Sequence, residues 1–132
     1  MRILRIAFIL LAIGVILGAF GAHALEKVLD EKSLKVWNTG VLYLFIHAMG
    51  LVLIQYGMKA GYLELKKGLW ASRFLLIGIL LFSGSLFLLS TQTATGINFK
   101  WLGPITPIGG LCLIAGWLTS ALSIGQKPTA NS

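Results

Sequence analysis

Charged residues are scarce in this sequence, and they are absent from four long stretches of it. The 132 residues include four Asp and Glu and eleven Lys and Arg, none of which falls within residues 6–22, 40–58, 74–89 or 102–124. With 57% hydrophobic residues and a mean hydropathy of +0.88, the chain has more apolar surface than a small soluble core can bury. This composition excludes an ordinary soluble domain and indicates an integral membrane protein.

Cysteine and histidine are also scarce, and the common catalytic motifs are absent. Cys112 is the single cysteine, which excludes an intramolecular disulfide and a C-x-x-C redox pair. No G-x-S-x-G elbow, H-E-x-x-H pair or phosphate-binding P-loop occurs. Two histidines, His23 and His47, are too few and too far apart in depth to favour a metal site or a bis-histidine haem. We therefore expect a protein that is not an enzyme and that has no metal and no cofactor.

Each uncharged stretch is close to the ~20 residues that a helix needs to cross a hydrocarbon core of about 30 Å. Backbone amides in lipid need internal partners, so stretches of this length are expected to be helices. Together they occupy more than half of the chain. We predict an all-α fold, a membrane four-helix bundle that forms one domain over residues 1–132 with approximate spans at 6–22, 40–58, 74–89 and 102–124.

The first span has some features of a secretory signal peptide. Arg2 and Arg5 precede it, and Ala22-His23-Ala24 has the A-x-A form of a cleavage site. Its apolar part is longer than the roughly 7 to 15 residues of a usual signal-peptide core. We therefore expect this segment to be a transmembrane helix.

The basic residues are unevenly distributed between the two sides of the membrane. One side would hold both ends of the chain and the connection between the second and third spans, with seven Lys and Arg; the other would hold four, together with three acidic residues. The positive-inside rule then predicts a multi-pass protein with both termini cytoplasmic. We expect these cations to set topology and to contact membrane lipids, with no nucleic acid as partner. The seven are Arg2, Arg5, Lys59, Lys66, Lys67, Arg73 and Lys127.

The polar stretch between the first two spans, residues 25–39, has its apolar residues on one helical face. We predict an amphipathic segment at the outer membrane surface. Asp30 followed by Glu31 is typical of an N-cap with an acidic first turn, so a helix that starts there would continue into the second span. The tryptophans predicted to anchor the helices at the membrane surfaces are Trp37 and Trp101 on the outer side and Trp70 on the inner side.

Glycine is abundant, with sixteen residues, many of them within the spans. Gly14-x-x-x-Gly18 has the small-xxx-small spacing that allows two helix backbones to approach closely. Packing within the bundle is the first interpretation, and a homo-oligomeric interface is the alternative, which the sequence does not separate from it. The glycines predicted to pack helices are Gly14, Gly18, Gly21, Gly84, Gly109 and Gly110.

His47 is the most informative polar residue, because an ionisable side chain at membrane depth costs free energy and indicates a functional site by default. At ~1.5 Å rise per residue it lies roughly 10 Å below the outer start of its span. The same arithmetic places polar residues from the other spans in the outer third of the bundle. This predicted cluster has two open interpretations, interhelical hydrogen bonding or a small pocket for a lipid headgroup, a proton or a polar ligand. Its members are His23, Asn38, Tyr43, His47, Ser83, Ser85 and Thr106.

Four segments in order resemble one family, the small integral membrane proteins classed as domain of unknown function 423, with YgdD-like and YwdK-like members. The resemblance covers nearly the whole chain and implies a four-helix protein of the bacterial cytoplasmic (inner) membrane. It implies no activity. One departure is Phe87, where the resemblance leads us to expect a tyrosine. The segments are Gly18-Ala19-Phe20-Gly21-Ala22-His23, Asn38-Thr39-Gly40 with Tyr43 and His47-Ala48, Leu81-Phe82-Ser83-Gly84-Ser85-Leu86, and Gly103 with Thr106-Pro107 and Gly109-Gly110.

Three functional hypotheses follow. The first is a non-enzymatic membrane protein of unassigned role whose outer polar cluster is structural and offers a site for a lipid or small polar ligand. The second is an oligomeric transporter or channel component. The third is an accessory or assembly partner of another membrane protein. The first hypothesis requires His47 to face inward against the third or fourth helix.

Overall fold

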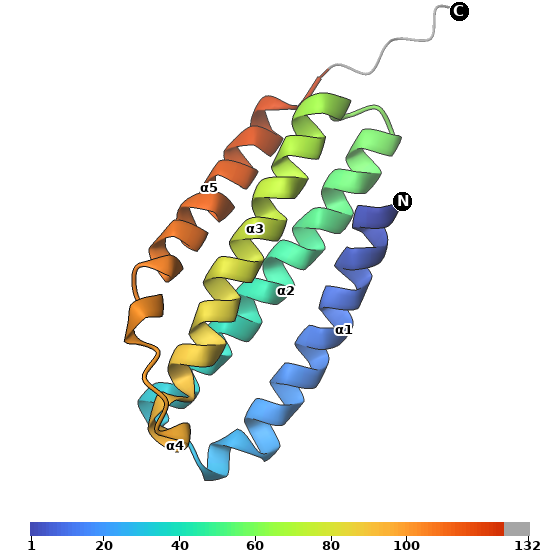
Figure 1. Cartoon of the computed structure of the whole chain (residues 1–132). Helices are drawn as coiled ribbons and strands as arrows, with labels where there is room; N and C mark the ends of the chain where they lie inside the picture. Colours follow the sequence, from blue (N-terminus) through green and yellow to red (C-terminus); the bar gives the residue numbers. More distant parts are fainter. Residues whose placement is uncertain (126–132) are drawn as a thin grey trace, which may run out of the picture.

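Four long helices lie side by side in a computed structural model that describes residues 1–125 of the chain. In Figure 1 they follow one another across the molecule in chain order, each next to its sequence neighbour. They are α1 (Arg2–His23), α2 (Glu31–Lys59), α3 (Leu65–Ser90) and α5 (Ile105–Leu122). Three short elements lie in the connections: η1 (Leu25–Lys27), α4 (Gln92–Thr95) and η2 (Lys100–Leu102). The predicted all-α four-helix fold is confirmed; Lys127 and the rest of the tail lie outside the described residues.

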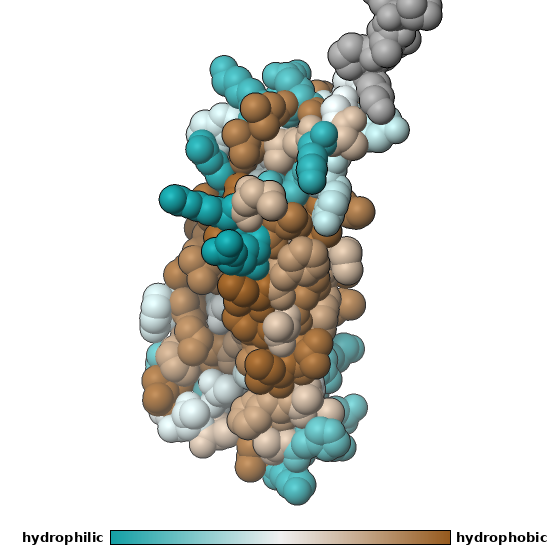
Figure 2. Space-filling model, turned by 90° about the vertical axis from the view of Figure 1, so that its right-hand side faces the viewer, coloured by the Kyte–Doolittle hydropathy of each residue, from teal (hydrophilic) through white to brown (hydrophobic). Residues whose placement is uncertain are grey.

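The surface of the bundle is apolar around its middle and polar at its two ends. Figure 2 shows this band on the face that it presents, with hydrophobic side chains between two hydrophilic caps. Large apolar side chains are open to the surroundings on every long helix, as Val15, Leu53, Leu80 and Leu111 illustrate. Each of the four segments is long and apolar enough to cross a membrane. Such a surface suits lipid, because in water it would expose far more apolar area than a monomer tolerates.

The two ends of the bundle differ in which connections they contain. At the termini end, the described chain begins at Met1 and stops at Gly125, and the turn from α2 to α3 lies beside these points. The opposite end holds residues 24–30 and 91–104. The termini end is tied together by backbone hydrogen bonds, since Glu64 N–H donates to the Ser123 carbonyl at 2.7 Å and Gly125 N–H to the Tyr62 carbonyl at 3.0 Å. The α2–α3 turn is thereby fixed to the end of α5.

The helix α2 starts where the sequence predicted. Asp30 is its N-cap, and the Asp30 carboxylate accepts a hydrogen bond from the Ser33 N–H at 2.8 Å. The helix then runs without a break into the second span. The predicted amphipathic segment is thus the turn η1 followed by the first turns of α2, not a separate surface helix. Part of its apolar face is buried, because Leu25 and Leu29 pack against Trp37, while Val28 is 62% exposed.

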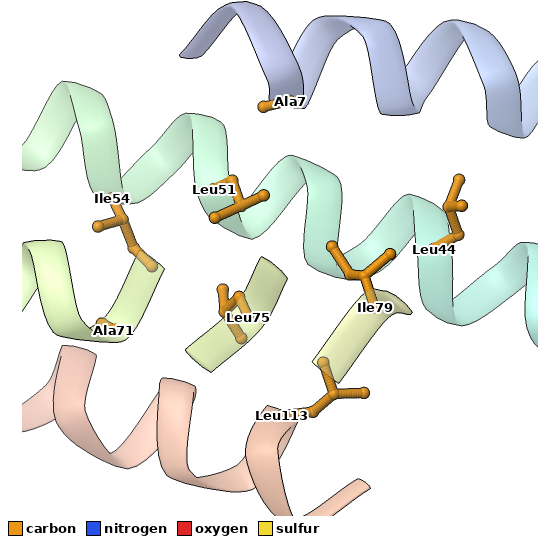
Figure 3. Close-up of a cluster of buried hydrophobic side chains, with 8 residues drawn as sticks. All are labelled: Ala7, Leu44, Leu51, Ile54, Ala71, Leu75, Ile79 and Leu113. Atoms are coloured by element: carbon orange, nitrogen blue, oxygen red, sulfur yellow. The ribbon is translucent and has the colours of Figure 1, made fainter. Parts of the chain in front are cut away.

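The hydrophobic core lies mainly between α2, α3 and α5. Leu51 and Leu75 are fully buried at its centre, and Figure 3 shows them facing each other across α2 and α3. The helix α1 adds one fully buried side chain, Ala7. This uneven contribution leaves α1 the least buried of the four helices. Of the residues in its most apolar stretch 11% are buried, against 39% for α2. The core residues are Ala7, Leu44, Leu51, Ile54, Ala71, Leu75, Ile79 and Leu113.

Candidate functional site: the His47 cluster

His47 lies on the face of α2 that is turned toward α3 and α5. Tyr43, His47 and Gly50 follow one another at helical spacing, so their side chains share one face. The His47 side chain is 5% exposed, and its ring centroid lies 6.0 Å from that of Trp117 on α5. The inward orientation that the first hypothesis requires is therefore observed.

The hydrogen bonding of His47 fixes which ring nitrogen carries a proton. Nδ1 lies 2.6 Å from the Tyr43 carbonyl oxygen, one turn earlier in the same helix. A carbonyl can only accept, so Nδ1 is the donor, and in the neutral ring Nε2 is a free acceptor. Within residues 1–125, Nε2 makes no hydrogen bond. Among these residues, Ser83 Oγ is the one polar side-chain atom that is both fully buried and without a hydrogen bond. Because Nε2 of His47 also has no partner, it must keep some contact with the surroundings.

Two aromatic rings lie beside the imidazole, and a third packs behind one of them. The Tyr43 ring stacks on His47 with centroids 5.6 Å apart, and Phe82 of α3 lies 4.5 Å from Tyr43. On the other side, Trp117 packs against Gly50, where an added Cβ would lie 2.8 Å from the indole. Tyr43 and Trp117 are 37% and 39% exposed, so both reach the surface of the bundle. We call Tyr43, His47, Phe82 and Trp117 the His47 cluster.

A hydrogen bond between helices adjoins this cluster. Ser85 Oγ and Thr106 Oγ1 are 2.7 Å apart and join α3 to α5. The Ser85 hydroxyl also donates to the Phe82 carbonyl at 2.9 Å, which uses its single proton. Thr106 is therefore the donor of the interhelical bond. Phe82 connects the two features, because its ring contacts Tyr43 and its carbonyl accepts from Ser85.

The other three residues predicted for the polar cluster lie elsewhere. Ser83 and Ser85 are two positions apart, which turns their side chains by about 200° around a helix, so they face opposite sides of α3. Ser83 lines a groove on the α1 side that also contains Leu10, Ile13 and Ile79 and has a volume of about 360 Å³. His23 and Asn38 are exposed at the opposite end of the bundle. His23 and Asn38 thus lie at the end of the bundle where the sequence placed them, and Ser83 faces α1 and not His47.

The glycines predicted to pack helices differ in how much space surrounds them. Space for a Cβ is lacking at Gly14, which faces Leu44, at Gly21, which faces Trp37, and at Gly109, which lies against the backbone of Phe82. A Cβ at Gly18 or Gly110 would make ordinary contacts of 3.5 and 3.7 Å. At Gly84 it would meet nothing within 4 Å, so a packing role within the monomer is wrong for this residue. The homo-oligomeric alternative stays a prediction.

Two polar contacts between helices were not predicted from the sequence. Trp37 is not a surface anchor, since it is buried and its Nε1–H donates to the Leu17 carbonyl of α1 at 3.0 Å. Gln55 donates to Ser72 Oγ at 2.9 Å and joins α2 to α3 near the termini end. Ser72 lies outside the predicted third span, residues 74–89. The helix α3 begins at Leu65, before the uncharged stretch from which that span was predicted. Among residues 1–125 no group of three or more His, Cys, Asp or Glu side chains is placed to hold a metal.

Comparisons with known proteins place these features in context. The family model "Protein of unknown function (DUF423)" matches residues 17–110, a range that includes Tyr43, His47 and Phe82 but not Trp117. A UPF0382 membrane protein of Staphylococcus haemolyticus is 42% identical over 106 residues, which cover 80% of each chain. UPF0382 membrane protein YwdK of Bacillus subtilis is 43% identical over 111 residues, 83% of this chain and 82% of the relative.

The similarity extends beyond bacteria. A UPF0382 membrane protein of the yeast Schizosaccharomyces pombe is 37% identical over 111 residues, which cover 83% of this chain and 88% of the relative. No solved structure matches the chain.

Proposed function

The chain belongs to the DUF423 family of membrane proteins, and from this premise we propose that it is a non-enzymatic protein whose His47 cluster binds a lipid headgroup or a small polar ligand. The ligand would be one that donates a hydrogen bond. The observation that carries the proposal is the buried imidazole, with Nδ1 held by the Tyr43 carbonyl and Nε2 left without a partner in the described chain.

The surroundings of His47 support a bound molecule more than a catalytic step. The rings of Tyr43 and Trp117 flank His47 and Phe82 packs against Tyr43, and a few polar groups among such apolar surroundings are typical of ligand sites. The described contacts of His47 include no nucleophile and no carboxylate that would use it as a base. The Ser85–Thr106 hydrogen bond has a structural role in this proposal, because it joins α3 to α5 beside the site.

Binding can be tested with headgroups that differ in donors. Phosphatidylethanolamine carries N–H donors and phosphatidylcholine carries none, so we expect native mass spectrometry of the detergent-purified protein to show preferential retention of the former. His47→Phe keeps a ring but removes Nε2 and should abolish the preference. The matched control is His23→Phe, because His23 is exposed and lies outside the cluster. Equal retention of both lipids, or the same loss in both variants, would contradict the proposal.

We further propose a bacterial cytoplasmic membrane as the location, with both termini cytoplasmic and membrane lipids as partners. The support is the charge distribution, because Lys59, Lys66 and Arg73 lie toward the termini end while the acidic Glu26, Asp30 and Glu31 lie at the opposite end.

The single cysteine makes the orientation straightforward to test. In a Cys112→Ser background, Thr93→Cys introduces a thiol at the opposite end and Lys66→Cys one at the termini end. An impermeant maleimide added to intact cells should label the first and spare the second. The reverse pattern would overturn the proposed orientation.

A further inference from the structure

A pocket lies at the termini end, far along α2 from the His47 cluster. The pocket lies between the start of α1, the end of α2 and the start of α3, three segments that Figure 1 shows toward the termini end of the bundle. Its volume is about 400 Å³, within the ~300–1,000 Å³ range of small-molecule sites. Met1 and side chains of α1, α2 and α3 line it: Met1, Leu4, Gln55, Tyr56, Met58, Lys59, Leu65 and Leu69.

The polar part of this pocket is cationic. Lys59 is exposed at its edge, and among residues 1–125 the single salt bridge joins Lys67 to Glu64 at 2.7 Å, so Lys59 has no acidic partner. Arg5 lines an adjoining pocket that shares Leu4 with the first. The described termini end has six Lys and Arg and one acid: Arg2, Arg5, Lys59, Lys66, Lys67, Arg73 and Glu64.

The remaining walls are mainly apolar, and this determines what kind of anion fits. Leu4, Leu65 and Leu69 line the space, and one of the two N–H groups of the Gln55 side-chain amide donates to Ser72. A soluble phosphate would contact Lys59 and leave these leucines uncovered. A lipid brings both parts, since its phosphate can lie at the cation while an acyl chain covers the leucines. Basic pockets between transmembrane helices bind anionic headgroups in this way.

We propose that this pocket binds one anionic phospholipid, with the phosphate at Lys59 and an acyl chain along Leu4 and Leu69. A zwitterionic lipid suits it less, because its own cation would lie near Lys59 and Arg5. This site is separate from the His47 cluster, and its occupancy does not depend on the function proposed there.

The test compares phosphatidylglycerol with phosphatidylcholine, titrated into the purified full chain in detergent and followed by native mass spectrometry. We expect at least tenfold tighter binding of phosphatidylglycerol. Lys59→Gln should reduce that preference several-fold. Lys35→Gln is the matched control, because Lys35 is an exposed lysine of the same helix at the opposite end, and it should leave the preference unchanged. Both substitutions are at exposed positions, so loss of the fold is not expected.

Three results would overturn the proposal. Equal binding of the two lipids would remove the charge argument. An equal reduction by Lys59→Gln and Lys35→Gln would indicate general attraction to a basic protein and not a site. Displacement of phosphatidylglycerol by millimolar glycerol phosphate would indicate a soluble anion as the occupant. If the His47→Phe test failed, the preference for phosphatidylglycerol, its reduction in Lys59→Gln and its resistance to glycerol phosphate would still be expected. The two proposals can therefore fail independently.

Discussion

The contact between α3 and α5 differs in kind from the contact that α1 makes with the rest of the bundle. Between α3 and α5 the backbones touch, since Gly109 lies against the backbone of Phe82 and a Cβ added at Gly116 would lie 3.3 Å from the carbonyl oxygen of Ala71. A side-chain hydrogen bond joins Ser85 to Thr106 across the same interface. The contact of α1 is made mainly with α2 through side chains, and a groove lined by Ser83 separates α1 from α3.

This difference indicates where the bundle is rigid and where it can adapt. Backbone-to-backbone packing has almost no freedom to relax, because no rotamer change relieves a collision there. Packing through side chains next to a groove can relax. The His47 cluster is built on the rigid side, with Phe82 from α3 and Trp117 from α5, which suits a site that needs fixed geometry. The following predictions test this division from the largest expected effect to the smallest.

Gly109→Ala should have the largest effect. Its Cβ would collide with the Phe82 backbone, so α5 must move away from α3, and we expect a loss of about 3 kcal/mol of unfolding free energy. Gly84→Ala is the control, because a Cβ there meets nothing within 4 Å, and its stability should be unchanged or raised by up to ~1 kcal/mol. Denaturation with sodium dodecyl sulfate in mixed micelles measures both. Equal losses in the two variants would remove the distinction between rigid and adaptable packing.

Trp37→Phe tests the attachment of α1. The change removes the hydrogen bond from Nε1 to the Leu17 carbonyl and leaves a smaller ring beside Gly21, for an expected loss of about 1–2 kcal/mol. Because α1 is held by few such contacts, trypsin should cleave faster after Lys27, in the turn between α1 and α2. Trp101→Phe, at an exposed tryptophan, is the control and should cleave at the original rate. An unchanged rate in Trp37→Phe would mean that α1 is held by other contacts.

The fold was predictable because its main determinant is the distribution of uncharged runs, which sequence records directly. The start of α2 was predictable for a similar reason, since an N-cap is a local feature of Asp30 and the residues that follow it. The start of α3 was not, because its first turns carry Lys66 and Arg73 on exposed positions and so look like a polar connection.

The candidate site was predictable in part. Depth follows from counting along a helix, which correctly placed Tyr43 with His47 and Ser85 with Thr106. Rotation about the helix axis does not follow from depth, because it depends on which neighbours pack on each side. Ser83 shares the depth of Ser85 but faces α1. A tryptophan beside a span is typical of a surface anchor, whereas the burial of Trp37 depends on the close approach of α1 at Gly21.

Ser85→Ala should have a smaller effect than either change above. It removes the interhelical bond to Thr106, and transmembrane side-chain bonds of this kind contribute about 0.6 kcal/mol on average. The rigid glycine packing should keep α3 and α5 together without it. Ser90→Ala is the matched control, because Ser90 bonds only the Phe87 carbonyl of its own helix. A loss above ~2 kcal/mol for Ser85→Ala would show that hydrogen bonding and not glycine packing dominates this interface.

The smallest effect is expected at Asp30, which lies where the α1–α2 connection meets α2. The Ser33 backbone N–H, and next its hydroxyl, bond the carboxylate and lower the pKa of Asp30 below its ordinary value of 3.8. A carboxyl whose pKa is lowered by folding stabilises the fold above that ordinary value, and this contribution is lost as pH falls through the lowered pKa. Asp30→Asn keeps a capping side chain without the charge. The difference in melting temperature between the original chain and Asp30→Asn should therefore be present at pH 6 and shrink below pH 4. A difference that stays constant across this range would mean that the charge of Asp30 contributes nothing to the cap, and that α2 begins here because of its packing against α1 alone.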